Sequence, residues 1–435
     1  MKLISHRSFP RAILHVDGDS FFVACEVARD PSLRGKPVVT GKERGIASAL
    51  SYEAKALGAT RAMRISRIRA LIPDVIVLPS DYETYSLYSE RMYGIVRRYT
   101  EAIEEYSIDE CFADLTGMRR PNAMSYEDMA ARIKRDLDNE LGITFSVGLS
   151  LNKVCAKIAS KWHKPSGLTV IRGKELHAYL ECTPIEKVWG IGPNTSAYLH
   201  TLGITTAYEF ACKDQIWVRT HVSKPFQEIH AELNGSYVYP LILGRKRQYA
   251  SISKTKTFTP PSRDREFIFS QLSKNAENAC IKLRRHGLFA KSFAFFLKTQ
   301  EFNYYGLDVK LAQAVSAPQE IVSHMRRNFE AVFRRGRQYR ATGVVLMDLR
   351  HSDAGTMNLF DASGKADTLK MILGAVDLID HKFGKHTVFL GSSLAAMTAP
   401  AHYGDRAEAS RRRTHLLKGE NGRQRLGIPI IGSVS

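Results

Sequence analysis

The sequence predicts an α+β protein built from mixed β-sheets with helices on one face. Two observations lead to this fold class. Apart from a short insert, residues 11–162 run in the order strand, helix, strands, helix, strand. Residues 249–349 follow a β-α-β-β-α-β order, which can form a complete domain. With 435 residues, the chain exceeds one ordinary hydrophobic core, so we expect two to four domains.

The first part of the chain is expected to form a sheet whose strands end in carboxylates. An apolar strand at 11–17 precedes a helix at 20–29, for which Ser20 is a candidate cap and Asp19 is interpreted as the N-cap. Residues 30–80 are short, basic segments broken by glycine and proline, and we interpret them as a small insert. The remaining predicted elements are a helix at 81–100, strands at 103–106 and 111–115, a helix at 125–141, a strand at 143–149 and a helix at 151–162.

Residues 172–240 contain short helical patterns only, and Gly190-Ile191-Gly192 lies between two of them. Glycine lacks a Cβ, so such a turn can approach a nucleic-acid backbone closely. Free N–H groups at the start of the next helix can then bind a phosphate. The pattern indicates a helix-hairpin-helix, with a plain tight turn as the alternative.

The second module begins with a strand in which serine and threonine alternate with Lys254 and Lys256. Such a strand could lie along a phosphate backbone, or it could be a solvated edge strand whose charges discourage aggregation. The elements expected in and after this module are a strand at 249–258, a helix at 264–286, strands at 291–299 and 303–311, a helix at 317–335, a strand at 341–349 and a helix at 365–383.

Charge is concentrated in this second module. The whole chain has a net charge of +19, and residues 245–350 hold 21 Lys and Arg against 8 Asp and Glu. Solubility alone does not require such concentration, whereas a phosphate backbone does. The distribution therefore favours a nucleic-acid partner.

Other classes are excluded by composition. No apolar run is long enough to span a membrane, and the N-terminus lacks the pattern of a secretory signal, so we expect no membrane partner and a cytoplasmic, nucleoid-associated protein. The six cysteines are scattered without metal-binding spacing, which indicates reduced thiols in the core.

Carboxylates at two strand ends carry the chemistry. Asp17 ends one apolar strand, and Asp109 and Glu110 lie beside another. Burying several carboxylates is costly unless cations accompany them, so either metal ions or basic side chains must be present. Oxygen ligands suit Mg²⁺, and the carbonyl of Gly18 could add one more. Two such ions can hold the attacking and leaving oxygens of a phosphoryl transfer.

Candidate phosphate ligands occur at two other places. Tyr52 and Lys55 are separated by one helical turn, so they can face one ligand. Lys164 opens the turn Lys164-Pro165-Ser166-Gly167 after a predicted helix. Together with a two-metal site, these groups are compatible with a triphosphate site.

These motifs together resemble those of the Y-family, or translesion, DNA polymerases, in the group of DNA polymerase IV and the polymerase V catalytic subunit. The similarity runs in order over residues 11–350, and six motifs in order are far more specific than one. The motifs are residues 16–22, 51–55, 107–110, 146–153, 164–167 and 190–192.

The resemblance implies a right-hand polymerase with a ferredoxin-like palm and a helical thumb that carries the helix-hairpin-helix. Its subdomains would be a palm at 1–28 and 82–171, fingers at 29–81, a thumb at 172–240, a linker at 241–245, a β-α-β-β-α-β little finger at 246–350 and a tail at 351–435.

The resemblance also implies roles for single residues. Asp17, Asp109 and Glu110 would be catalytic and, with Gly18, would hold two Mg²⁺ ions, for which Mn²⁺ can substitute. Phe22 would be the steric gate that rejects a ribose 2′-OH, and Phe21 would point the other way. Further expected contacts are Phe21, Phe22, Tyr52, Lys55 and Lys164 to the nucleotide, and Gly190, Gly192, Lys254, Lys256, Arg284 and Arg285 to DNA.

The implied activity is template-directed DNA synthesis of low fidelity from dNTPs on primer-template DNA, with bypass of lesions. Thr356–Phe360 resembles a sliding-clamp peptide, with Met357, Leu359 and Phe360 as its contacts. An accessory subunit of the polymerase V type is a second expected partner. A two-metal nuclease and a non-catalytic DNA-binding protein remain the alternatives.

Overall fold

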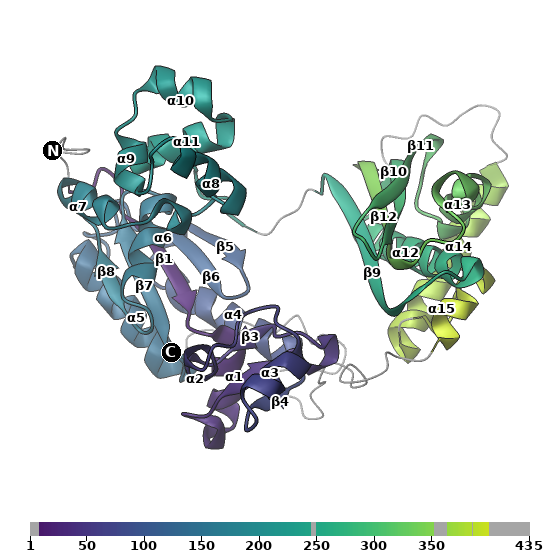
Figure 1. Ribbon diagram of the computed structural model, residues 1–435, viewed down its shortest axis with the longest axis horizontal. Helices are drawn as coiled ribbons and strands as arrows, with labels where there is room; N and C mark the ends of the chain where they lie inside the picture. The colour runs from purple at the N-terminus through teal and green to yellow at the C-terminus, as the bar shows by residue number, and fades with distance from the viewer. Residues whose placement is uncertain (1–7, 245–248, 352–362, 385, 400–435) are drawn as a thin grey trace. The chain divides into compact units, whose positions relative to one another are not determined.

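The computed structural model describes residues 8–244, 249–351, 363–384 and 386–399. The described residues up to 244 and those from 249 to 399 form two compact units (Figure 1). Each unit has its own hydrophobic core. Among the described residues, no helix has both the length and the apolar character needed to cross a bilayer.

A five-stranded sheet lies at the centre of the first unit, in the order β5-β6-β1-β7-β8. The neighbours pair antiparallel except β7 and β8, which are parallel. The mixed sheet predicted from the sequence is therefore present. Its strands are β1 Ile13–Gly18, β5 Ile103–Ser107, β6 Glu110–Asp114, β7 Phe145–Ser150 and β8 Leu168–Val170.

Helices cover both faces of this sheet, which corrects the expectation that they lie on one face (Figure 1). Leu14 and Val16 of β1 pack in one core with α4 (Tyr82–Arg97) and α5 (Tyr126–Leu141). The alternate residue Ile13 packs with Ala156 of α6 (Lys153–Trp162) on the opposite face.

Gly148 of β7 explains how closely α6 approaches the sheet. A Cβ on Gly148 would lie 2.2 Å from both the Ala156 carbonyl oxygen and the Ser160 nitrogen. A residue with any side chain would therefore push α6 off the strand. The lysines of this helix are in this way held over the face of the sheet that contains Asp17.

The predicted insert is a small layer of its own. Its sheet has the order β3-β2-β4, and Ile65 and Ile68 belong to its core. The Ser51 hydroxyl accepts a hydrogen bond from the Ala54 nitrogen, so Ser51 caps the short helix α2. The elements from α1 through the insert are α1 Phe21–Arg29, Pro31–Leu33 (3₁₀), β2 Val38–Thr40, Lys42–Arg44 (3₁₀), β3 Ala49–Leu50, α2 Tyr52–Ala56, α3 Ile65–Leu71 and β4 Ile76–Leu78.

Residues 172–240, which follow β8, form short helices, as the sequence predicted. Asn152, the N-cap of α6, donates to the carbonyl of Glu232 at 2.7 Å, and the Glu232 carboxylate accepts from the Val154 nitrogen. These bonds attach the helical segment to α6. Its elements are Gly173–Glu175 (3₁₀), α7 Leu176–Glu181, Ile185–Lys187 (3₁₀), α8 Pro193–Thr201, α9 Ala207–Ala211, α10 Gln215–His221 and α11 Lys224–Leu233.

The second unit has the predicted β-α-β-β-α-β order. Its antiparallel sheet is ordered β11-β10-β12-β9, and α12 and α13 pack on one face. A predicted helix is present as α14, whereas η6 and α15, which pack on α12, were not predicted. The elements are β9 Ser251–Ser262, α12 Arg265–Arg285, β10 Leu288–Thr299, β11 Tyr304–Val315, α13 Pro318–Val332, β12 Tyr339–His351, α14 Ser363–Phe383, η6 Gly391–Ser393 and α15 Leu394–Thr398.

Candidate active site

The carboxylates predicted at two strand ends come together in the fold. Asp17 of β1 is the direct cross-strand partner of Glu110 of β6. The Gly18 nitrogen donates to the carbonyl of Asp109 at 2.9 Å, which fixes the β5–β6 turn beside the end of β1. Asp17 and the pair Asp109-Glu110, about ninety positions apart in the chain, therefore meet at one end of the sheet.

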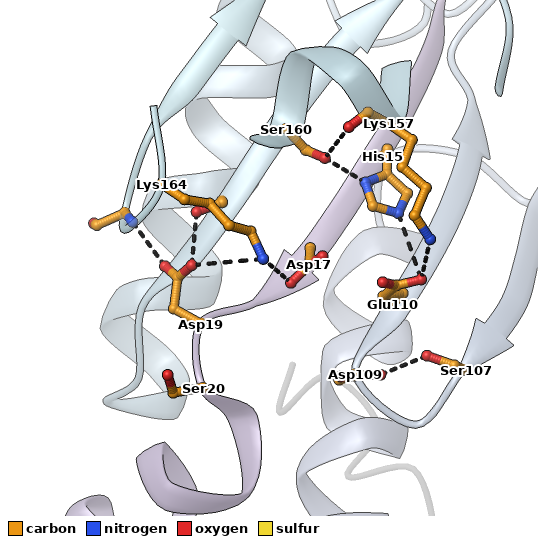
Figure 2. A network of polar contacts seen from close by, with 12 residues as sticks. His15, Asp17, Asp19, Ser20, Ser107, Asp109, Glu110, Lys157, Ser160 and Lys164 are labelled. Carbon is orange, nitrogen blue, oxygen red and sulfur yellow. Dashed lines mark hydrogen bonds and ion pairs between the residues drawn. The ribbon is translucent and has the colours of Figure 1, made fainter. Parts of the chain in front are cut away.

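Two lysines neutralise two of these carboxylates, those of Glu110 and Asp17 (Figure 2). Lys157 Nζ of α6 lies 2.6 Å from Glu110 Oε2. Lys164 Nζ, from the turn after α6, is paired with Asp17 Oδ1. The sequence left open whether metal ions or basic side chains accompany the buried carboxylates. In this structure, basic side chains do. The same contacts show that the carboxylates of Glu110 and Asp17 each lie within reach of a cation.

His15 is a site residue that sequence reasoning missed. It lies two positions before Asp17 on β1, so both side chains occupy the same face, and its side chain is fully buried. The Ser160 hydroxyl is directed to the Lys157 carbonyl at 3.1 Å, so His15 Nδ1 carries the proton and donates to Ser160 Oγ at 2.7 Å. Nε2 then presents a lone pair 3.9 Å from Glu110 Oε2.

Burial sets the protonation of this cluster. Loss of hydration raises the pKa of Asp17 to about 6 against the opposing charge of Lys164. It lowers the pKa of His15 to about 4, which keeps the ring neutral at pH 7. Burial also opposes ionisation of Glu110, whereas the ammonium of Lys157 at 2.6 Å favours it, and the pKa of Glu110 is lowered.

This donor set fits a divalent cation. One ligand atom each from His15, Asp17 and Glu110 lies within 4.8 Å of the others. His15 Nε2 is buried and has no hydrogen-bond partner among the described residues, so its lone pair is available to a cation. The carboxylate of Asp109 lies at the adjoining turn, where it accepts a hydrogen bond from Ser107 at 2.5 Å.

Asp19 is not the helix N-cap that the sequence suggested. Ser20 occupies that position in a left-handed conformation with φ 47°, and it forms no side-chain cap. The carboxylate of Asp19 instead accepts from the Ser146 hydroxyl and from the Ser166 nitrogen, each at 2.7 Å. Asp19 therefore fixes the turn that carries Lys164 beside β1 and β7.

The three residues predicted to hold a triphosphate gather around this turn. Lys55 Nζ donates to Ser20 Oγ at 2.7 Å and lies 4.1 Å from the centre of the Tyr52 ring. The Tyr52 hydroxyl is 3.4 Å from Asp19 Oδ1, and Lys164 Nζ is 4.0 Å from the same oxygen. Burial lowers the pKa of Lys55.

The two phenylalanines after Asp19 have different surroundings. Phe21 is 3% exposed and packs in the core between the sheet and α4, so its side chain offers little surface to a nucleotide. Phe22 is half-buried and stacks on Tyr85 of α4, with ring centroids 4.4 Å apart. Of the two, Phe22 has the ring that can contact a ligand.

Among the predicted DNA contacts, Gly190 and Gly192 form the turn before α8. Gly190 has φ +92°, a left-handed conformation that favours glycine, and a Cβ there would lie 2.7 Å from the end of the Ile229 side chain. Gly192 is the N-cap of α8, whose first residue is Pro193.

The basic residues of the second unit differ in their partners. Lys254 and Lys256 lie on β9, an edge strand of its sheet. Arg284 of α12 is paired with both carboxylate oxygens of Asp377 and donates to the Ser316 carbonyl, whereas Arg285 is exposed. The predicted clamp contacts Met357, Leu359 and Phe360 lie outside the described residues.

Comparison with known proteins identifies the family. DNA polymerase IV of Lactococcus lactis subsp. cremoris strain MG1363 is 33% identical over 328 residues, which cover 74% of this chain and 89% of that protein. The model of the impB/mucB/samB family matches residues 16–161, and that of its C-terminal domain matches 249–359. The chain belongs to the impB/mucB/samB family of Y-family DNA polymerases.

Other Y-family matches agree with this assignment. DNA polymerase IV of Desulfatibacillum aliphaticivorans is 30% identical over 86% of this chain and 95% of that protein. A solved Y-family DNA polymerase chimera, Dbh-Dpo4(243-245)-Dbh, superimposes with a TM-score of 0.67 at 24% identity, covering 78% of this chain and all of that one. The resemblance and the right-hand fold predicted from the sequence are confirmed.

Proposed function

We propose that this chain is a template-directed DNA polymerase of low fidelity that extends a primer from dNTPs across damaged templates. The observation that carries the proposal is the cross-strand pair of Asp17 and Glu110, with Asp109 at the adjoining turn. Tyr52, Lys55 and Lys164 gather next to this acidic group. An acidic group beside cationic and phenolic donors suits a nucleoside triphosphate.

The relatives favour this reading over the two alternatives. Curated family members that match most of this chain are named DNA polymerase IV. A nuclease would have no use for a triphosphate site, and a purely DNA-binding protein would have no use for buried carboxylates at a strand end. Neither alternative explains both groups of residues.

The metal ions are proposed to be two Mg²⁺, held by Asp17, Asp109 and Glu110 with the carbonyl of Gly18. Such ions lower the barrier by neutralising the charge of the reacting phosphate and by favouring the ionised primer 3′-OH. Lys164 and Lys157 must then release the carboxylates that they pair with here. Mn²⁺ is expected to substitute, since it accepts the same oxygen ligands.

The chain's own side chains position the nucleotide. The ammonium groups of Lys55 and Lys164 and the Tyr52 hydroxyl are donors for the triphosphate oxygens, and they lie next to the carboxylates. The ring of Phe22, supported from behind by Tyr85, is proposed to exclude a ribose 2′-OH. Positioning and charge neutralisation would supply most of the rate.

The proposed partners follow from this activity. Primer-template DNA would contact Gly190, Gly192 and the basic second unit, in which Lys254, Lys256 and Arg285 are the proposed phosphate contacts. A sliding clamp and an accessory subunit of the polymerase V type are proposed from the sequence motifs alone. A chromosomal substrate implies the cytoplasm, at the nucleoid, as the working compartment.

Primer extension tests the proposal. With Mg²⁺ and dNTPs, the Asp109→Ala variant should extend a labelled primer about 10³-fold more slowly or not at all, while its affinity for primer-template DNA in a fluorescence anisotropy assay stays near that of the wild type. Asp74→Asn, an exposed carboxylate of the insert, is the matched control.

Two results would contradict the proposal. Extension by Asp109→Ala at the wild-type rate would remove the site assignment. Cleavage of the DNA without dNTPs, lost in the same variant, would favour the nuclease.

A further inference from the structure

Lys157 lies between a proposed metal ligand and two aromatic rings. Its Nζ is 2.6 Å from Glu110 Oε2, and its side chain is 8% exposed. The same ammonium lies 4.7 Å from the centre of the Tyr106 ring and 5.4 Å from that of Trp189. Lys157 therefore has two kinds of partner within reach, a carboxylate and a pair of π faces.

The two rings come from different parts of the first unit. Tyr106 belongs to β5, the edge strand of the sheet. Trp189 belongs to the helical segment and directly precedes Gly190, the first glycine of the proposed DNA-binding turn. The Trp189 ring packs edge-on against Tyr106 with centroids 5.5 Å apart, and it also contacts Phe112 at 5.9 Å. The aromatic group thus joins the sheet to the start of the hairpin.

Glu110 cannot serve Lys157 and a divalent ion in the same way at once. An ammonium at hydrogen-bond distance from a metal-bound carboxylate would repel the ion strongly, because the site is mostly shielded from water. A buried ammonium without a partner is also costly. The faces of Tyr106 and Trp189 offer that partner, since an ammonium over an aromatic ring is stabilised when it is desolvated.

We propose that Lys157 is a resident counter-ion that competes with the metal for Glu110, and that it moves onto the Tyr106 and Trp189 rings when the metal binds. Metal binding would then change the surroundings of the Trp189 ring, next to the hairpin. This inference rests on the proposed function, because it requires a metal at Glu110.

Lys164 differs from Lys157 in this respect. Its side chain is 27% exposed, and it is one of the three donors proposed for the triphosphate. When the ions bind, Lys164 has an incoming anion to contact, whereas Lys157 has aromatic rings. The proposal therefore concerns Lys157 and predicts an effect that needs no nucleotide.

Direct metal binding tests the competition. Mn²⁺ is titrated into the full-length protein without DNA, and free Mn²⁺ is followed by electron paramagnetic resonance. Lys157→Met removes the competing ammonium, so its Mn²⁺ affinity should rise about tenfold over the wild type. Lys161→Met removes the same charge one helical turn away, and its effect should be several-fold smaller. Equal or weaker binding by Lys157→Met than by Lys161→Met overturns the inference.

A charge-conserving variant covers the case in which Lys157→Met does not fold. In Lys157→Arg the guanidinium can bind Glu110 through two parallel hydrogen bonds, so Mn²⁺ affinity should fall several-fold below the wild type. Unchanged or tighter binding by Lys157→Arg would contradict the competition.

The fluorescence of Trp189 tests the second half of the inference. Mg²⁺ should change the tryptophan emission of the wild type, and this change should be absent in Lys157→Met and in Trp189→Phe. The chain has 3 tryptophans, so Trp189→Phe identifies the responding one. A response that persists in Lys157→Met would refute transfer onto the rings.

A control separates this inference from the proposed function. If the wild type binds no Mn²⁺ and Glu110→Gln changes nothing, the metal site itself is wrong. If the wild type binds Mn²⁺ and Glu110→Gln weakens that binding while Lys157→Met does not tighten it, the metal site stands and only the role of Lys157 is rejected.

Discussion

The ring of Phe22 lies flat against the ring of Tyr85, with an angle of 12° between their planes. The Tyr85 hydroxyl donates to Glu26 at 2.8 Å, and Tyr85 is fully buried, so it is a fixed support. A steric gate requires such support, because a ring that could rotate away would not exclude a 2′-OH. The pair therefore predicts that sugar selection depends on Tyr85 as well as on Phe22, because Tyr85 holds the Phe22 ring in place.

Phe22→Ala should raise ribonucleotide incorporation relative to dNTP incorporation by about tenfold or more, since the ring that excludes the 2′-OH is gone. Tyr85→Leu should produce a smaller change in the same direction by loosening Phe22. Tyr85→Phe keeps the stacked ring and should stay near the wild type. Single-nucleotide insertion assays with matched rNTP and dNTP measure the ratio. Unaltered sugar selection in Phe22→Ala would refute the gate.

Lys55 should contribute to nucleotide binding through its charge. Lys55→Met should lower kcat/KM for dNTP insertion by about 10- to 100-fold, because a hydrogen bond to a charged group typically contributes about 1.5–3 kcal/mol. Most of the loss should appear in KM if the contact forms in the ground state. Lys36→Met, an exposed lysine of the same insert, is the control. Steady-state insertion kinetics measure both, and equal effects would dismiss a specific role for Lys55.

His15 and Asp17 predict opposing pH effects on the stability of the first unit. The folded pKa of His15 is about 4, below its ordinary 6.5, so acidification through this range protonates the unfolded state and destabilises the fold. The folded pKa of Asp17 is about 6, above its ordinary 3.8, so acidification between these values protonates the folded state and stabilises it. Between pH 6 and pH 4 the two effects largely cancel.

Replacing one of these two residues should reveal the pH effect of the other. As the pH falls from 6 to 4, the free energy of unfolding of His15→Gln should rise relative to that of the wild type, by about 1.4 kcal/mol for each pH unit. In Asp17→Asn it should fall relative to the wild type with the opposite slope. Urea unfolding followed by tryptophan fluorescence reports on this unit, since Trp162, Trp189 and Trp217 all belong to it. Parallel pH profiles in all three proteins would contradict the shifts.

The sequence predicted the convergence of Asp17 with Asp109 and Glu110 because strand ends carry their side chains to a known edge of a sheet. It did not predict His15 or Lys157. His15 and Asp19 each lie two positions from Asp17, so the spacing alone does not show which of them shares its face. The strand ends at Gly18, so Asp19 lies beyond the alternation that places His15 and Asp17 on one face.

Long-range packing accounts for the other differences. The path of α6 across the face that carries Asp17 depends on Gly148, and a glycine inside a strand can have several meanings in a sequence. Asp19 before a helix has the pattern of an N-cap, and only the positions of Ser146 and Ser166 reveal its actual partners. In the sequence Arg284 has no evident partner, but in the structure it pairs with Asp377 of α14, which is 93 residues away.

The different partners of Arg284 and Lys256 give a final prediction for DNA binding. Lys256 is exposed on β9, so Lys256→Ala should reduce the slope of log affinity for primer-template DNA against log salt concentration by about 0.9, the value for one lost phosphate contact. Arg284→Met should leave this slope near the wild-type value and should lower the stability of the second unit, because Asp377 loses its partner. Salt titrations by fluorescence anisotropy and thermal unfolding measure the two effects. A salt slope reduced in Arg284→Met as much as in Lys256→Ala would mean that Arg284 leaves Asp377 to bind DNA.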